Sequence, residues 1–169
     1  MTPTFDAARD LRISRVIRAR PTAIWRAWTD PRSVEQWWVP APATCRVVAM
    51  DLRPGGALTT EISEGGAPFA PHLDACFLEV VEDTRLVFTN ALVRDWRPAV
   101  QPFMTAVISL VPHADGTEYT AHVMHKDPAQ KTQHAQLGFD DGWGTVIGQL
   151  ARLVESDARG GALTSTPFA

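Results

Sequence analysis

Hydrophobic and polar positions alternate near the start of the chain. Over residues 11–19, apolar side chains hold every second position, with Arg15 as the exception, which predicts a half-buried strand ending before Pro21. Ile24, Trp25 and Trp28 then share one face of a short helix. A second short helix is expected to begin at Asp30-Pro31, an N-cap followed by proline, and to end before the prolines at 40 and 42.

Residues 44–126 show only strand and turn signals. Strand-like runs occupy residues 44–52, 58–62, 73–81, 85–93, 104–110 and 118–125, and residues 96–102 form a proline-containing connector. Turns are expected at RPGG (53–56), at the glycine pair 65–66 and at ADG (114–116). Short strands at hairpin spacing predict an antiparallel sheet.

The apolar period returns to 3.6 residues after Asp127-Pro128, a second N-cap and proline pair. It predicts one long helix that ends at Gly160-Gly161, with an apolar stripe of Phe139, Trp143, Val146, Ile147, Leu150, Leu153 and Val154. A stripe this wide must lie across the sheet. We therefore expect one α+β domain over residues 11–156, in which a curved sheet wraps a helix, with an N-terminal extension (1–10) and a flexible tail (157–169).

Composition excludes several classes of protein. The 169 residues (18.5 kDa) carry 16 Lys and Arg against 19 Asp and Glu, and a net charge of −3 argues against nucleic-acid binding. No apolar run reaches the roughly 18 residues of a membrane span, and the first ten residues do not resemble a secretory signal. Cys45 and Cys76 lack CxxC spacing, so we expect two buried, reduced thiols and a cytoplasmic protein.

Four motifs resemble one family: WTDPRSVEQWWVP (28–40), DLRPGG (51–56), RLVFTN (85–90) and GFDDGWGTVIGQL (138–150). They are similar to the SRPBCC, or START-like, superfamily, in the branch named after homologues of the co-chaperone that activates a heat-shock-protein ATPase. The resemblance implies a helix-grip fold with a deep cavity between the long helix and the concave face of the sheet. The superfamily includes lipid carriers, polyketide cyclases and oxygenase subunits, so fold alone does not select a function.

The predicted cavity has apolar walls and a few polar groups, which is typical of a small-molecule pocket, although an ordinary solid core has the same composition. Glycines at 138, 142, 144 and 148 indicate either close packing of the helix on the sheet or room for a ligand. The candidate cavity residues are Trp38, Phe77, Phe88, Asn90, Met104, Ile108, Tyr119, His125, Phe139, Trp143 and Ile147.

No metal site, cofactor or catalytic residue is assigned. His122 and His125 point to opposite faces of a strand, and His134 can approach His125 without a carboxylate converging on the pair. His125 with Tyr119, on the same strand face, is the one acid–base pair to consider.

The leading hypothesis is a protein that binds a small hydrophobic molecule. The alternatives are a cavity-based enzyme of the cyclase or hydrolase type and a chaperone-interaction module. Exposed strand edges add the expectation of a homodimer.

Overall fold

The computed structural model describes residues 3–162. Its first half contains β1 (Asp10–Ile17), α1 (Pro21–Thr29), α2 (Pro31–Val34), β2 (Thr44–Met50), β3 (Ala57–Ser63), β4 (Ala70–Val81) and β5 (Arg85–Thr89). Its second half contains β6 (Leu92–Val93), the 3-10 turn η1 (Arg94–Trp96), β7 (Arg97–Pro98), β8 (Thr105–His113), β9 (Gly116–Met124), α3 (Pro128–Gln136) and α4 (Phe139–Ala162).

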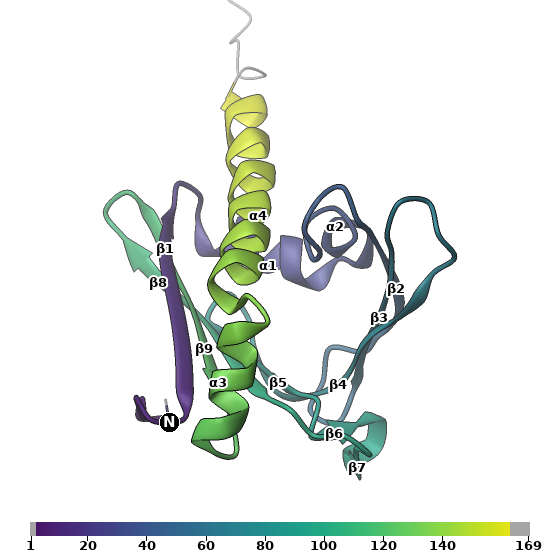
Figure 1. Cartoon of the computed structure of the whole chain (residues 1–169). Helices are drawn as coiled ribbons and strands as arrows, with labels where there is room; N and C mark the ends of the chain where they lie inside the picture. The colour runs from purple at the N-terminus through teal and green to yellow at the C-terminus, as the bar shows by residue number, and fades with distance from the viewer. Residues whose placement is uncertain (1–2, 163–169) are drawn as a thin grey trace, which may run out of the picture.

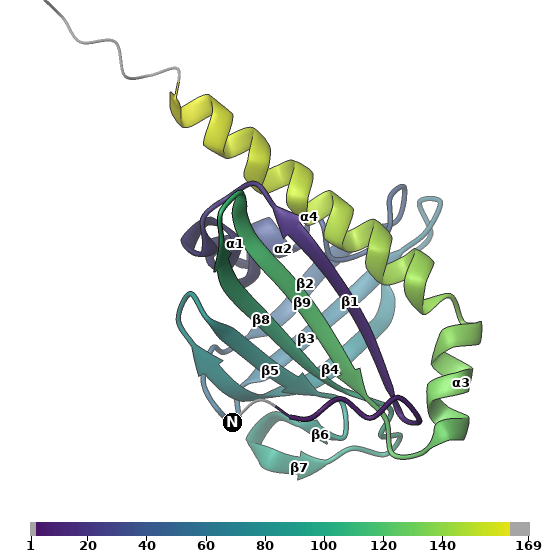
Figure 2. The same ribbon diagram turned by 90° about the vertical axis from the view of Figure 1, so that its left-hand side faces the viewer.

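Seven strands form one antiparallel sheet in the order β1-β9-β8-β5-β4-β3-β2. The sheet curves around α4, and the two short helices α1 and α2 lie beside α4 at one end of the groove (Figure 1). Seen from the side of β1, α4 crosses the strands diagonally and α3 lies near the end of the sheet where β9 finishes (Figure 2). The expected α+β arrangement of a sheet wrapped around a C-terminal helix is therefore confirmed.

The predicted strand over residues 85–93 is interrupted. Pairing between β5 and β8 stops at Thr89, and the Oδ1 atom of the next residue, Asn90, accepts hydrogen bonds from the backbone N–H groups of Phe103 and Met104. The chain beyond Asn90 leaves the large sheet and forms β6, which pairs only with β7. The connector expected at 96–102 thus contains half of a small two-stranded sheet.

The single long helix predicted after Asp127 is two helices. Asp127 is the N-cap of α3, as expected, and its side chain accepts a hydrogen bond from the backbone N–H of Gln130. The chain breaks at Gly138, whose φ of +91° lies in a region that glycine adopts readily. The predicted end at Gly160-Gly161 is wrong, because α4 continues to Ala162. A glycine costs only about 1 kcal/mol in a helix, which is too little to ensure that an established helix stops there.

Most of the apolar side chains form one core between the sheet and the helices. Trp28, Trp37 and Trp38 pack edge to face, with ring centroids 4.9–5.5 Å apart. Because α2 ends at Val34, Trp37 and Trp38 lie in the turns that follow it, and both are buried. Among residues 3–162, no helix is long and apolar enough to cross a membrane.

Candidate functional site

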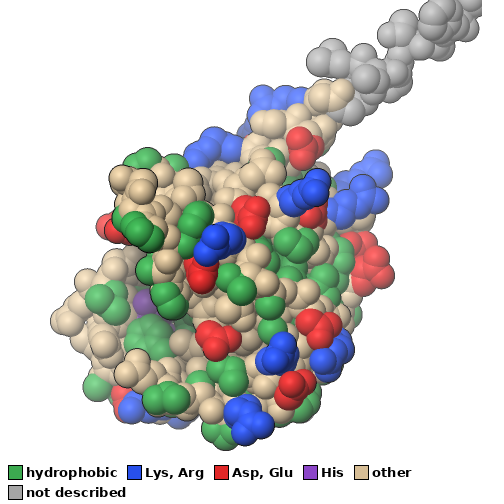
Figure 3. Space-filling model, turned by 90° about the vertical axis from the view of Figure 1, so that its right-hand side faces the viewer, with side chains coloured by type: hydrophobic (Ala, Val, Ile, Leu, Met, Phe, Trp, Pro, Cys, Tyr) green, Lys and Arg blue, Asp and Glu red, His purple; other side chains and the backbone are tan. Residues whose placement is uncertain are grey.

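A cavity of about 470 Å³ lies between the α3–α4 junction and the sheet. Four of its lining residues, Phe139, Gly142, Trp143 and Val146, follow one face of α4 at helical spacing. In the space-filling view, a hollow opens on this side of the molecule, and a histidine and hydrophobic side chains are visible inside it (Figure 3). The cavity is therefore open to solvent on one side and apolar within.

Some glycines of α4 allow the helix to pack closely on the sheet, and another leaves room in the cavity. A Cβ atom added to Gly144 would lie 3.7 Å from Ile13 of β1, and one added to Gly148 would lie 3.5 Å from Arg15 of the same strand. These two glycines belong to the contact between α4 and the sheet. A Cβ atom on Gly142 would meet nothing within 4 Å, so this glycine leaves space in the cavity.

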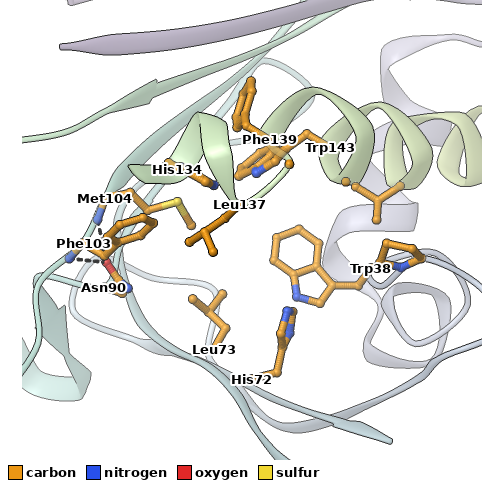
Figure 4. Close-up of a pocket in the computed structure, with 14 residues that line it drawn as sticks. Trp38, His72, Leu73, Asn90, Phe103, Met104, His134, Leu137, Phe139 and Trp143 are labelled. Carbon is orange, nitrogen blue, oxygen red and sulfur yellow. Dashed lines mark hydrogen bonds between the residues drawn. The ribbon is translucent and has the colours of Figure 1, made fainter. Parts of the chain in front are cut away.

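The remaining wall comes from five separate segments of the chain. These are the turn after α2 (Trp38, Pro40), the start of β4 (His72, Leu73), the residue that follows β5 (Asn90), the approach to β8 (Phe103, Met104) and the end of α3 with the following residues (His134, Leu137, Gly138). In Figure 4, Asn90, Phe103, Met104 and His134 gather at one end of the cavity, and Trp38 and His72 lie at the other. None of the lining residues is Asp, Glu, Lys or Arg, so the cavity has no fixed charge.

The amide of Asn90 has a defined orientation. Its Oδ1 atom lies 3.1 Å from the nitrogen of Phe103 and 2.8 Å from the nitrogen of Met104, and both N–H groups donate to it (Figure 4). The oxygen is therefore committed to the backbone. The amide nitrogen remains as a hydrogen-bond donor in a residue that lines the cavity.

Two histidines meet at the end of the cavity where Asn90 lies. The Nδ1 atom of His134 lies 2.9 Å from the Nε2 atom of His125, whose own Nδ1 lies 2.9 Å from the carbonyl oxygen of Arg9. The His134 ring also packs against Phe103 and Phe139, with centroids 5.0 and 5.1 Å away. Burial among these groups, with a smaller contribution from His125, lowers the pKa of His134 to about 4. His134 is therefore uncharged at neutral pH.

His72, in β4, belongs to the opposite end. Its Nδ1 atom lies 3.1 Å from the hydroxyl oxygen of Thr60, and partial burial of the ring lowers the pKa of His72. Next to it in Figure 4 is Trp38, whose indole N–H is buried and has no hydrogen-bond partner among the described residues. This end offers polar atoms but no charge at neutral pH.

The structure places the eleven cavity candidates in three groups. Five of them line the cavity, namely Trp38, Asn90, Met104, Phe139 and Trp143. Five others belong to the buried core and do not line it, namely Phe77, Phe88, Ile108, Tyr119 and Ile147. His125 lines a second cavity, of about 390 Å³, on the other side of Phe103 and Met104.

The five core residues point inward but are covered by other side chains. The rings of Trp28 and Trp38 each lie 6.0 Å from the ring of Phe88, which closes the middle of the groove. The cavity is therefore confined to the end of the groove near the α3–α4 junction. The alternation of apolar and polar residues along a strand identifies the face that points inward. It does not show which part of that face is covered by another element.

Tyr119 and His125 do not form an acid–base pair. They are six positions apart on an extended strand, which separates them by about 20 Å. Tyr119 is fully buried in the core, where desolvation raises its pKa above the usual value. The expectation that His122 and His125 face opposite sides is confirmed, since His122 contacts Asp10 while His125 contacts His134.

Nine lining residues were not among the predicted cavity residues, namely Pro40, His72, Leu73, Phe103, His134, Leu137, Gly138, Gly142 and Val146. Of these, His134 had a signal in the sequence, because the turn from strand to helix was expected to bring it near His125. Phe103 lay between the connector predicted over residues 96–102 and the strand predicted from residue 104. Its position became defined only by the hydrogen bond from its backbone to Asn90.

A curved antiparallel sheet that grips a C-terminal helix over a cavity defines a helix-grip module. The family model described as "Activator of Hsp90 ATPase homolog 1-like protein" matches residues 18–155. The chain belongs to this family, and its assignment to that branch of the SRPBCC superfamily is confirmed.

Solved structures share this fold. A protein from Nitrosomonas europaea is 42% identical, with a TM-score of 0.83 over 92% of this chain and 99% of that chain. A protein from Chromobacterium violaceum is 28% identical, with a TM-score of 0.68 over 87% of this chain and 98% of that one. An AHSA1-like protein from Aeromonas hydrophila has the same fold at 20% identity, with a TM-score of 0.64 over 95% and 99%. Among curated proteins, none matches the chain.

Proposed function

We propose that this protein binds a small, largely hydrophobic molecule in the cavity beneath the α3–α4 junction. The observation that carries the proposal is an uncharged cavity of about 470 Å³ whose walls are mainly aromatic and aliphatic. Ligand sites generally have volumes of about 300–1,000 Å³ and a few polar groups that orient the ligand. Asn90, His72 and His134 are the polar groups here.

Burial of apolar surface would supply most of the binding free energy. Each Å² of apolar surface removed from water contributes about 25 cal/mol, before the cost of immobilising the ligand. A charged ligand would lose its hydration without gaining an ion pair, because no lining residue carries a fixed charge. The cavity therefore favours an uncharged compound.

Gly142 supports a binding cavity over incidental loose packing. A glycine within a helix costs about 0.8–1 kcal/mol relative to alanine, and no neighbouring atom prevents a side chain at this position. The cavity therefore lies beside a glycine, Gly142, that lowers the stability of the helix. A larger side chain at this position would extend into the cavity, so the glycine keeps that space open.

The substitution Gly142→Leu tests the proposal, with Nile red as an uncharged fluorescent probe. Leucine should fill the cavity and reduce Nile red affinity at least about tenfold while leaving the helix at least as stable. Gly160→Leu is the matched control, because a Cβ atom there also meets nothing within 4 Å but Gly160 does not line the cavity. Equal affinity for the Gly142→Leu protein and the wild type, both folded by circular dichroism, would reject the proposal.

A reducing compartment such as the cytoplasm fits the state of the cysteines. Cys45 and Cys76 are both free and buried, and burial raises the pKa of Cys45 to about 11, which disfavours the reactive thiolate. Disulfides are rare in such compartments.

We also propose homodimerisation through an exposed sheet edge. The edge strands are β1 and β2, and one edge N–H of β2, at Val47, already donates to Glu35. Light scattering at several protein concentrations measures the oligomeric state directly.

A further inference from the structure

The histidine pair at the end of the cavity has a definite proton arrangement. The Arg9 carbonyl oxygen can only accept, so the Nδ1 atom of His125 must carry the hydrogen that it donates. A neutral imidazole has one N–H group, so the Nε2 atom of His125 has none and must accept. It therefore accepts from the Nδ1–H group of His134, 2.9 Å away.

This arrangement leaves the Nε2 atom of His134 without a hydrogen. Within residues 3–162 that atom has no hydrogen-bond partner, and it is not one of the fully buried polar atoms that lack one, so it is accessible. His134 lines the larger cavity, while His125 lies behind it and lines the second cavity. An accessible hydrogen-bond acceptor therefore belongs to a residue that lines the cavity.

A proton shared by the two rings is the competing arrangement. It would require a cation among Phe103, Phe139 and Trp143, whose ring centroids lie 5.0, 5.1 and 6.4 Å from that of His134. No carboxylate in the described part of the chain contacts either ring. The same burial that lowers the pKa of His134 disfavours this cation.

We infer that the ligand is an uncharged aromatic compound with a hydroxyl group that donates its hydrogen to the Nε2 atom of His134. This inference rests on the proposed function and names the ligand class for the same cavity. The flat aromatic walls around His134 favour a ring, and a hydroxyl group satisfies an acceptor that an apolar ligand would leave buried and unpaired. The free amide N–H groups of Asn90 can donate to an oxygen of the same ligand.

The first test needs neither a variant nor a ligand. Long-range proton–nitrogen NMR of the ¹⁵N-labelled chain at neutral pH reports which ring nitrogen of each histidine carries the hydrogen. We expect His134 and His125 to be protonated at Nδ1. His122 is an internal control, because its Nε2 atom lies 2.8 Å from the Asp10 carboxylate and should be protonated there. A hydrogen on the Nε2 atom of His134 would overturn the inference.

The second test compares 2-naphthol with 2-methoxynaphthalene, which has the same rings but no hydroxyl hydrogen. The wild type should bind the naphthol about fivefold to tenfold more tightly, which is the effect of one net hydrogen bond. The variant His134→Phe, which keeps an aromatic ring and removes the acceptor, should bind both compounds equally. In His125→Phe, the naphthol preference should fall and the NMR spectrum should show His134 released from the Nδ1–H form.

The outcomes separate the two proposals. If the wild type binds both compounds with equal affinity, the inference about the hydroxyl group fails and the proposed hydrophobic binding stands. If it binds neither compound nor Nile red, the proposed function itself fails. A naphthol preference that persists in His134→Phe would also overturn the inference, because the acceptor would then be another group.

Discussion

The His134 ring is uncharged and is also fixed in one of its two neutral forms. Burial holds its ring neutral, and the contact with His125 selects which nitrogen carries the hydrogen. In water, a histidine takes up a proton near its ordinary pKa of 6.5 and can exchange between its two neutral forms. Inside the protein, the ring offers the cavity one defined lone pair.

The lowered pKa of His134 predicts a pH dependence of stability. Between its unfolded value of 6.5 and its folded value of about 4, the unfolded chain binds a proton that the folded chain does not. The free energy of unfolding should therefore be fully retained above the unfolded pKa and should fall as the pH is lowered towards the folded one. Urea midpoints measured across this interval test the prediction.

The variant His134→Gln is the control for the pH dependence. It removes the titrating ring and keeps a polar side chain, so its stability should decline less steeply over the same interval. An identical pH profile for the variant and the wild type would show that other groups account for the loss.

Two glycines near the start of α4 show how an element depends on backbone conformation as well as on space. A Cβ atom added to either Gly138 or Gly142 would meet nothing within 4 Å. Gly138 separates α3 from α4 with φ at +91°, whereas Gly142 is an ordinary helical residue. The two positions thus differ in dihedral angle and not in crowding.

The same substitution at these two positions should change stability in opposite directions. Gly138→Ala should lower the free energy of unfolding by about 1 kcal/mol, because alanine is strained at positive φ. Gly142→Ala should raise it by about 0.5–1 kcal/mol through helix propensity. Urea unfolding of the two variants beside the wild type provides the measurement. Stabilisation by both alanines would mean that the α3–α4 junction does not need the left-handed backbone.

On the scale of the whole molecule, one side chain connects α4 to the segment that follows α2. The amide nitrogen of Gln149 donates to the carbonyl oxygens of Trp37 and Val39, at 2.9 and 2.8 Å. Its amide oxygen accepts from the backbone N–H of Ala41, at 2.8 Å. These three bonds hold the wall that contains Trp38 against the helix.

Replacement of Gln149 should affect both stability and binding. Gln149→Met keeps the length of the side chain but removes all three bonds, and we expect a loss of about 1–3 kcal/mol in the free energy of unfolding. Nile red affinity should also fall, because Trp38 and Pro40 line the cavity next to this connection. Gln36→Met is a suitable control, since Gln36 is exposed and makes one local bond, to Arg32. Equal losses in the two variants would exclude a specific role for Gln149.

Patterns within single segments could be recognised without coordinates. The alternation over residues 11–19, the caps at Asp30 and Asp127, and the apolar stripe from Phe139 to Val154 each depend on local backbone geometry. They were sufficient to predict the antiparallel sheet and the helix that it wraps. Local preference was insufficient where competing energies are small, as at Gly138 and Gly160.

The chain by itself determined the inward faces of its elements and the family to which it belongs. Only the tertiary structure decided which inward residues meet empty space, because that depends on what other elements cover them. Trp28 and Trp38 cover Phe88 from positions 60 and 50 residues earlier in the chain. The contact with His125, which is itself held by Arg9, decides which nitrogen of His134 has no hydrogen. No periodicity in the sequence indicates these contacts.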